Sequence, residues 1–422
     1  MTDERIQRST DRYFYYLFVM TLVFGVMFYD TIGFTFTDEI CALLLVCLYA
    51  ARVATTPSWP TNKGLLITFA VFSFYFAYSL AIQSNTPAAI ATDCVIQIKP
   101  YLGFFCVYAI APRFSVRQRR TIRRLAVLFA GYTAVVAALY VSSPETIKYT
   151  FGGEARLATA VTIIGLLYLY FSKSSTFNST VYLAIMVIGL FSGRSKFYGF
   201  FTASCLTMVY IHRRRRAFRI SAATAVFVTF AFAAVLLVAW DKISFYFATA
   251  ILGDSQSTID LYARAALYMF TWPLLIHHIP FGTGFASYAT YTSGVYYSPL
   301  YSSLGIDNIY GLTRSNPDFL SDTYYPALAQ FGFVGILLFA SFWFYAAKKA
   351  AGALRIGARK EGLVALLVVV FFLIECTSDS TITHNRGVFM MMLLGLVLGD
   401  IKRMRSELSS AVVGWPAQVA QH

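Results

Sequence analysis

Apolar runs long enough to cross a bilayer recur along the whole chain, and this pattern limits the possible folds more than any other feature. A membrane-spanning helix needs about 20 predominantly apolar residues. Of the 422 residues, 58% are hydrophobic and only 13% are charged, whereas roughly 25% are charged in an average soluble domain. No long polar stretch is left for a separate soluble catalytic domain. The sequence therefore predicts an all-α polytopic membrane protein.

The formal net charge of +14 would also suit a nucleic-acid-binding protein, but the placement of the charge favours a topological signal. Lys and Arg cluster between apolar runs, in segments 113–124, 213–219, 348–360 and 402–405. Loops on the cytoplasmic side of membrane proteins are enriched in these residues. We therefore place the four clusters in the cytoplasm and expect no nucleic-acid partner.

With these clusters as fixed points, we predict about twelve transmembrane helices and two cytoplasmic termini. A mixed-charge start and the lack of a small-residue cleavage site indicate that the first run is a retained span. The predicted spans are 13–29, 34–51, 64–82, 94–111, 125–141, 157–171, 179–192, 196–211, 218–240, 321–346, 361–377 and 386–400. The chain then divides into spans 1 to 9 (1–240), a large periplasmic loop (241–320), spans 10 to 12 (321–400) and a cytoplasmic tail (401–422).

The predicted periplasmic loop is acidic, and a connection of this length is unusual unless it has a function. Its stretch STIDLYARAALYMFTWPLLIHH (257–278) begins with capping residues and continues with apolar residues at helical spacing. We expect an amphipathic helix that lies along the membrane surface and carries Arg264 near its start. The six cysteines lie in apolar segments without CxxC spacing. We interpret them as small buried hydrophobic residues and expect no metal ion or other cofactor.

Basic and acidic side chains gather at the predicted outer ends of the spans. The basic ones are Lys99, Arg156, Arg194, His384 and Arg386. Each could simply extend to the membrane interface, but together they predict a cationic cavity. Such a cavity suits a phosphate-bearing, lipid-linked substrate, because guanidinium groups bind phosphate in a bidentate manner. Asp318 and Asp322 stand in RSNPDFLSDTYYPALAQFG, directly before the apolar run FVGILLFASFWFYAA of the tenth predicted span.

Several short motifs between residues 150 and 346 resemble those of the bacterial O-antigen ligase and polysaccharide polymerase (Wzy-type) superfamily. Arg156-Leu157 matches an arginine-leucine pair that enters a span, and 192–195 (SGRS) approximates a serine-arginine pair in a periplasmic hairpin. Arg264, followed by 280–284 (PFGTG), matches an arginine that precedes a P..G.G turn. The resemblance implies a GT-C-like membrane fold and glycosyl transfer from a polyprenyl-pyrophosphate-linked sugar.

The last matching motif departs from the family at one position. Gly332 and Gly335 fit a pattern that follows a histidine-asparagine pair, but this chain has Ser321-Asp322 where the pair stands. In the ligases the histidine is thought to serve the acceptor hydroxyl, so the departure favours a polymerase. It also means that the general base cannot be transferred from the family.

The chemistry assigns roles to the candidate residues. Arginines are the natural group to stabilise a pyrophosphate leaving group, and a carboxylate could take or orient the acceptor proton. Asp322 could equally cap the helix that follows it. The loop tyrosines could pack against sugar rings or form an interfacial aromatic belt. The predicted catalytic residues are Asp322, Asp318, Arg264 and Arg194, and the predicted pyrophosphate- or sugar-binding residues are Arg156, Lys99, Arg314, Tyr324, His384 and Arg386.

We expect a glycosyltransferase of the bacterial inner membrane that polymerises lipid-linked repeat units at the periplasmic face. Its partners would be the polyprenyl-pyrophosphate-linked oligosaccharide, membrane lipids, a chain-length regulator and a flippase. Two alternatives remain at this point. One is an O-antigen ligase that transfers glycan to an acceptor lipid. The other is a transporter of lipid-linked sugars, which would carry charged residues at mid-span and broken helices in both halves.

Overall fold

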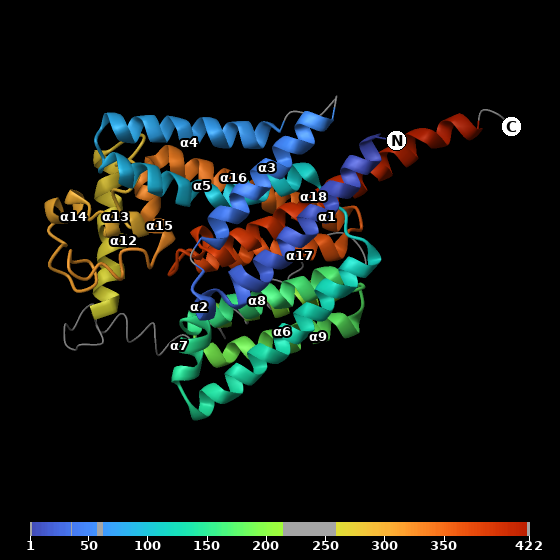
Figure 1. Ribbon diagram of the computed structural model, residues 1–422, viewed down its shortest axis with the longest axis horizontal. Helices are drawn as coiled ribbons and strands as arrows, with labels where there is room; N and C mark the ends of the chain where they lie inside the picture. The colour runs from blue at the N-terminus through green and yellow to red at the C-terminus, as the bar shows by residue number, and fades with distance from the viewer. Residues whose placement is uncertain (1, 35, 57–61, 214–258, 420–422) are drawn as a thin grey trace.

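The computed structural model describes residues 2–34, 36–56, 62–213 and 259–419, and the side chains of 210–262 and 411–422 are left out of the description (Figure 1). Helices are the regular elements of these ranges, which contain no strand, so the predicted all-α class is confirmed. The long helices are α1 (Thr2–Met20), α3 (Thr37–Thr55), α4 (Lys63–Ala81), α5 (Pro87–Ile110), α6 (Val116–Ser142), α8 (Glu154–Phe171), α9 (Thr176–Ile188), α10 (Ser195–Arg213), α12 (Ile259–His277), α16 (Gly332–Arg355), α17 (Arg359–Glu375) and α18 (Asn385–Val419).

Short helices connect or extend the long ones. They are η1 (Thr21–Met27), α2 (Tyr29–Ile32), α7 (Glu145–Phe151), η2 (Gly189–Ser192), α13 (Tyr291–Val295), α14 (Pro299–Ser303), α15 (Tyr324–Ala327), η4 (Leu328–Phe331) and η5 (Thr381–Thr383). Local sequence explains several boundaries. Ser115 and Gln118 form a capping box at the start of α6, and Thr86 caps α5 directly before Pro87, a residue favoured at the first helical position.

Five segments among the described residues are long and apolar enough to cross a membrane: α4, α5, α6, α8 and the stretch Tyr324–Arg355, which joins α15, η4 and α16. Residues 176–192 form a shorter apolar helix. The structure therefore supports a membrane protein with at least these candidate spans. The predicted span 218–240 lies outside the described residues, and each of the other eleven predicted spans coincides largely with helix.

Two helices form the centre of the bundle, because they are apolar on every face. In α8, every residue of 157–171 is buried, and in α18 the same is true of 385–401. α18 packs closely along α5, where a Cβ on Gly395 would come within 2.5 Å of the Phe104 carbonyl oxygen. Small residues allow such close approach between membrane helices. By contrast, α4 has only 22% of its apolar window buried and forms an outer wall.

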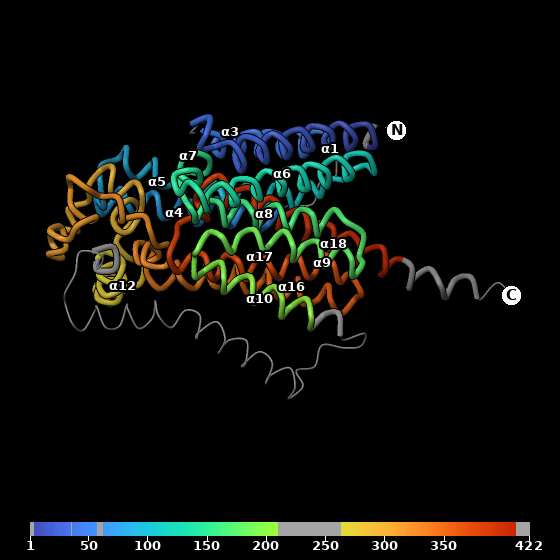
Figure 2. The backbone as a smooth tube through the Cα atoms, turned by 90° about the horizontal axis from the view of Figure 1, so that it is seen from below, coloured from blue at the N-terminus to red at the C-terminus, as the bar shows by residue number. Residues whose placement is uncertain are grey.

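The long helices run roughly along one axis except α12, which runs across them, and α12 to α15 gather at one end of the molecule (Figures 1 and 2). There, residues 278–323, called the connecting segment below, form a small core of their own. Tyr288, Tyr301, Leu312 and Leu320 are fully buried in it and pack with Leu267 of α12. The predicted amphipathic helix at 257–278 corresponds to α12, which stands at this end of the bundle.

The connecting segment is anchored to the hairpin between α4 and α5. Ser84 Oγ donates to the Phe285 carbonyl at 2.8 Å, and Asn85 Nδ2 donates to the Ala286 carbonyl at 2.8 Å. The Ala286 N–H donates to the buried Asp93 carboxylate at 2.7 Å. These bonds join residues about 200 positions apart in the chain, so the segment is held against the helices at several points.

The opposite end of the bundle collects the basic loops. The Arg113 N–H donates to Asp11 at 3.0 Å, Arg119 pairs with Asp400 at 3.4 Å, and Lys360 donates to the Ser172 carbonyl at 3.3 Å. The start of α1 lies at this end, as do the turn before α6, the turn between α8 and α9 and the last turns of α18 (Figure 1). The basic segments 113–124, 348–360 and 402–405 thus share one end, as a positive-inside topology requires, whereas most of 213–219 lies outside the described residues.

Candidate functional site

Arg264 and Asp322 form an ion pair at the end of the bundle that carries the connecting segment. Nη2 of Arg264 donates to Oδ2 of Asp322 at 2.6 Å, and both side chains are about three-tenths exposed. Arg264 comes from α12 and Asp322 from the turn before α15. The structure therefore joins two of the four predicted catalytic residues.

Asp322 does not cap the helix that follows it. Thr323 occupies the N-cap position of α15 without a side-chain capping bond, and α16 begins only at Gly332. The predicted start of the tenth span at residue 321 is close to that of the candidate span Tyr324–Arg355, which includes α15 and η4. Capping by Asp322, one of the two roles left open by the sequence, is therefore wrong, and its carboxylate remains directed to Arg264.

Asp30 brings two of the predicted substrate-binding arginines together. It lies in α2, its carboxylate is buried, and it accepts from Nη2 of Arg386 at 2.7 Å and from Nη1 of Arg156. Arg386 also donates through Nε to the Val26 carbonyl at 3.2 Å. Arg386 is almost fully buried whereas Arg156 is half exposed, so Arg156 is the one that could turn toward a ligand.

Arg194 pairs with Glu154 at 2.7 Å, between the turn before α10 and the first turn of α8. Glu154 stands two residues before Arg156, so the Arg194 and Arg156 pairs are neighbours through α8. Both side chains of the Arg194 pair are more than three-tenths exposed, and exposed pairs of this kind contribute at most about 1 kcal/mol to stability. A phosphate group could therefore replace Glu154 as the partner of Arg194.

A third charged group is built around Lys196, which the sequence analysis did not select. Lys196 Nζ lies 2.7 Å from Glu375 and 2.8 Å from Asp379, and the lysine is largely buried. Thr381 donates to Asp379 at 2.7 Å and to Glu375 at 3.2 Å. Burial opposes the charge on Asp379, but the Lys196 ammonium and the hydrogen bonds outweigh it and lower the pKa of this carboxyl. Lys196 is two residues from Arg194, so the same SGRSKF stretch supplies both cations.

Lys99 and Tyr324 are both buried and have protein partners. Lys99 Nζ lies 2.5 Å from Asp38 and also contacts Glu39. The Tyr324 hydroxyl donates to Oε1 of Gln97 at 3.2 Å. The structure thus places Tyr324 in the packed interior beside α5 rather than on a surface that a sugar could reach directly.

His384 lies close to the turn that holds Asp322. Its Nε2 is 3.4 Å from Oγ of Ser380, and that hydroxyl donates to the Ser321 carbonyl at 2.5 Å. The chain therefore connects His384, through Ser380 and Ser321, to the residue next to Asp322. Two hydrogen bonds thus connect His384 to the Ser321-Asp322 turn.

Arg314 and Asp318 stand apart from these pairs. Both are exposed on the connecting segment, and no ion pair links either of them to the other predicted residues in the described part of the chain. The loop tyrosines form a buried and an exposed group. Tyr288 and Tyr301 are buried in the small core, where Tyr288 donates to the Leu267 carbonyl at 2.6 Å, whereas Tyr291 and Tyr310 are more than half exposed.

The predicted cationic cavity is instead a network of balanced pairs. Lys99, Arg156, Arg194, Lys196, Arg264 and Arg386 each contact at least one carboxylate, and these carboxylates are at least as numerous as the cations. An anionic ligand at this end must therefore compete with carboxylates for the arginines. Within the described residues, no group of three or more His, Cys, Asp or Glu side chains could hold a metal ion.

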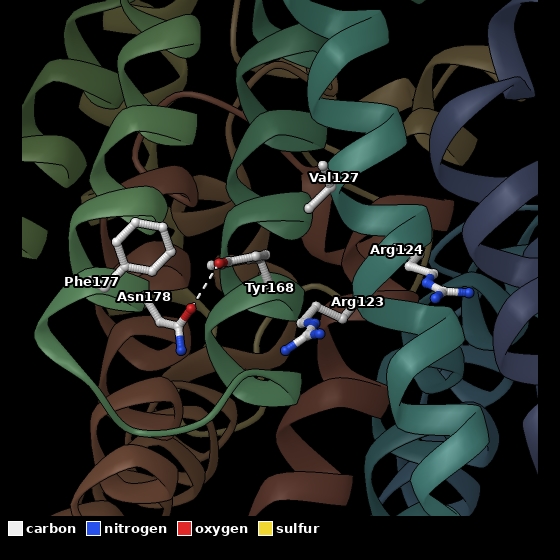
Figure 3. A pocket seen from close by; sticks show the side chains of 6 residues that line it. All are labelled: Arg123, Arg124, Val127, Tyr168, Phe177 and Asn178. Carbon is white, nitrogen blue, oxygen red and sulfur yellow. Dashed lines mark hydrogen bonds between the residues drawn. The ribbon is translucent and has the colours of Figure 1, made fainter.

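A separate hollow of about 370 Å³ lies between α6, α8 and α9, near the basic end (Figure 3). Arg123 extends into it toward Tyr168, whose hydroxyl donates to Asn178 at 2.9 Å. The hollow contains none of the predicted site residues, and its arginines belong to the basic cluster 113–124. Comparison of the chain with known protein families and with curated protein sequences found no match.

Proposed function

We propose that the protein is a metal-independent glycosyltransferase of the bacterial inner membrane. It polymerises polyprenyl-pyrophosphate-linked oligosaccharide repeat units into an O-antigen, capsule or exopolysaccharide at the periplasmic face. The proposal includes a GT-C-like arrangement of about twelve spans and the resemblance to the O-antigen ligase and polymerase superfamily. The observation that carries it is the contact between Arg264 and Asp322, which places an electrophilic group and a carboxylate together at one end of the bundle.

The reaction needs both groups. The hydroxyl oxygen of an acceptor sugar attacks the anomeric carbon of the donor, and the bond from that carbon to the pyrophosphate oxygen breaks. The leaving polyprenyl pyrophosphate gains negative charge, which a guanidinium group stabilises. The hydroxyl proton must go to a base, and a carboxylate within hydrogen-bond reach of the hydroxyl can accept it.

Arg264 retains donors for such a ligand while it contacts Asp322. It uses Nη2 for the carboxylate, and its Nε is buried without a hydrogen-bond partner among the described residues. Arrival of a pyrophosphate gives Arg264 a second anion to bind. As the guanidinium turns toward the phosphate oxygens, Asp322 is freed to bind the acceptor hydroxyl.

The arrangement of glycine-rich turns agrees with the motif resemblance. A Cβ on Gly282 would lie 2.3 Å from the Ala329 carbonyl oxygen and 2.3 Å from the Gly332 nitrogen. The two glycine motifs, 280–284 and 332–335, therefore touch through their backbones at the base of the connecting segment. This contact ties the segment to the start of α16, close in sequence to Asp322.

Ser321-Asp322, in place of a histidine-asparagine pair, favours the polymerase over a ligase that acts on an acceptor lipid. The proposed partner proteins are a flippase that delivers the repeat unit and a regulator of chain length. The test is reconstitution of the purified protein in proteoliposomes with a lipid-linked repeat unit as the only sugar substrate. We expect a ladder of lipid-linked oligomers. Transfer to an added acceptor lipid without a ladder would instead indicate a ligase, and movement of intact substrate across the bilayer would indicate a transporter.

A further inference from the structure

An apolar groove of about 480 Å³ lies between α4, α5 and α16. Its size falls within the roughly 300–1,000 Å³ typical of small-molecule sites. Its lining runs along α4 from Lys63 to Tyr75, which corresponds to about 18 Å at 1.5 Å per residue. That length is a little more than half the roughly 30 Å thickness of a bilayer core.

The walls of the groove present apolar and aromatic surface. Phe72, Phe105, Phe339 and Phe342 are among the lining residues. Protein carbonyl groups bind two of the lining hydroxyl groups: Thr68 donates to the Gly64 carbonyl at 2.9 Å and Tyr75 to the Phe331 carbonyl at 2.7 Å. An occupant of the groove therefore needs hydrocarbon rather than polar groups along its length.

The groove is open on the outer side of the bundle. Ile67 of α4 and Leu338 of α16 line it and are 58% and 39% exposed. All three helices that form the walls belong to the candidate membrane spans. In a bilayer this opening faces lipid, so a hydrocarbon chain can enter sideways without crossing water.

One end of the groove is lined by a residue close in the chain to Asp322. Gln97 and Tyr324, which bond to each other, line that end. Tyr324 is two residues from Asp322, and its backbone N–H donates at 3.2 Å to the carbonyl of Cys376, the neighbour of Glu375. A ligand whose headgroup contacts Arg264 could therefore place its tail in the groove.

We propose that this groove binds the polyprenyl chain of the lipid-linked donor. The inference rests on the proposed function, because it identifies the tail of the same substrate whose pyrophosphate Arg264 would bind. It assigns positioning of the donor to α4, α5 and α16, helices that supply none of the predicted catalytic residues. Binding of the tail would fix the depth of the headgroup in the membrane relative to the Arg264–Asp322 pair.

Two neighbouring pairs of residues allow a matched test. Ile67 lines the groove and Leu66 does not, although both are 58% exposed on α4. Leu338 lines it and Leu337 does not, although both face outward from α16. A benzophenone amino acid is placed at each of these four positions in turn. The full-length protein is then irradiated in phospholipid nanodiscs that contain radiolabelled polyprenyl pyrophosphate without sugar.

We expect several-fold more label at 67 and 338 than at 66 and 337. Unlabelled polyprenyl pyrophosphate should remove the excess, and the same amount of added phospholipid should not. Equal labelling within each pair would overturn the proposal, and so would equal competition by phospholipid, which would mean that ordinary acyl chains fill the groove.

The labelling does not depend on polymer formation, so the two proposals can fail separately. Selective labelling in a protein that makes no ladder would support the proposed polyprenyl site and contradict the proposed polymerase activity. A ladder with equal labelling would do the reverse. As a functional check, Ile67→Trp should fill the groove and reduce ladder formation several-fold, whereas Leu66→Trp should leave it unchanged. Full activity of Ile67→Trp would count against the groove.

Discussion

Nη2 of Arg264 and Oδ2 of Asp322 lie 2.6 Å apart although 58 residues separate them in the chain. The contact joins the two ends of the connecting segment. Arg264 belongs to α12, which precedes the segment, and Asp322 lies at the segment's last turn. Under the proposed function, Arg264 binds the leaving pyrophosphate and Asp322 accepts the hydroxyl proton. Substitutions of Arg264 or Asp322 should therefore lower activity while the protein still folds.

Asp322→Asn should lower the rate of polymer formation by about 10²–10⁴, because the amide cannot take the acceptor proton. The amide can still accept a hydrogen bond from Arg264, so the protein should fold and reach the membrane in normal amounts. The measurement is ladder formation in proteoliposomes, corrected for protein content. Asp318→Asn is the matched control, since Asp318 is an exposed acid on the same turn region. Wild-type ladders from Asp322→Asn would rule out Asp322 as the base and make His384 the next candidate.

Arg264→Ala should lower the rate by about 10²–10³, the usual cost of removing one donor to a developing anion. Arg264→Lys should recover little of this loss, because a point charge cannot reproduce the guanidinium fork. Arg194→Ala should behave like Arg264→Ala if the exposed Arg194 turns from Glu154 to the substrate. The control is Arg314→Ala, which removes an exposed arginine of the connecting segment that forms none of these ion pairs. Equal activity of the Arg264 and Arg314 variants would contradict the assignment of the pyrophosphate.

The sequence was sufficient to predict several of the arginines that form ion pairs in the structure, but it could not predict their partners. Apolar runs and basic loops follow local rules of length and charge, and they led to Arg156, Arg194 and Arg386. Their partners are set by helix packing. Asp30 contacts Arg386, which is 356 residues away in the chain, and Lys196 contacts Asp379, which is 183 residues away. Asp30 itself sits between two apolar stretches, where nothing local distinguishes a structural anchor from an ordinary helix-end residue.

Asp30→Asn should destabilise the protein. It leaves Arg386, which is 7% exposed, without its carboxylate, and removing one partner of a buried pair costs about 3–5 kcal/mol. Thermal unfolding in detergent should show a lower midpoint. The double variant Asp30→Asn, Arg386→Gln should recover part of the lost stability, because it no longer contains the uncompensated charge of the arginine. A double variant that is as unstable as the sum of the two single variants would show that the two side chains do not depend on each other.

The contact between the two glycine motifs provides a test of how the connecting segment is held. Gly282 and Gly305 both have positive φ, at 78° and 68°, so an alanine at either position costs about 1–2 kcal/mol of backbone strain. Only Gly282 is also crowded: its Cβ would lie 2.3 Å from backbone atoms of Ala329 and Gly332, whereas a Cβ on Gly305 would have nothing within 4 Å. Overpacking of this kind adds about 1–3 kcal/mol. Gly282→Ala should therefore expose the connecting segment to limited proteolysis and lower polymer formation, and Gly305→Ala should show only a small loss of stability. Equal protease resistance of the two variants would mean that the contact between 280–284 and 332–335 does not hold the segment in place.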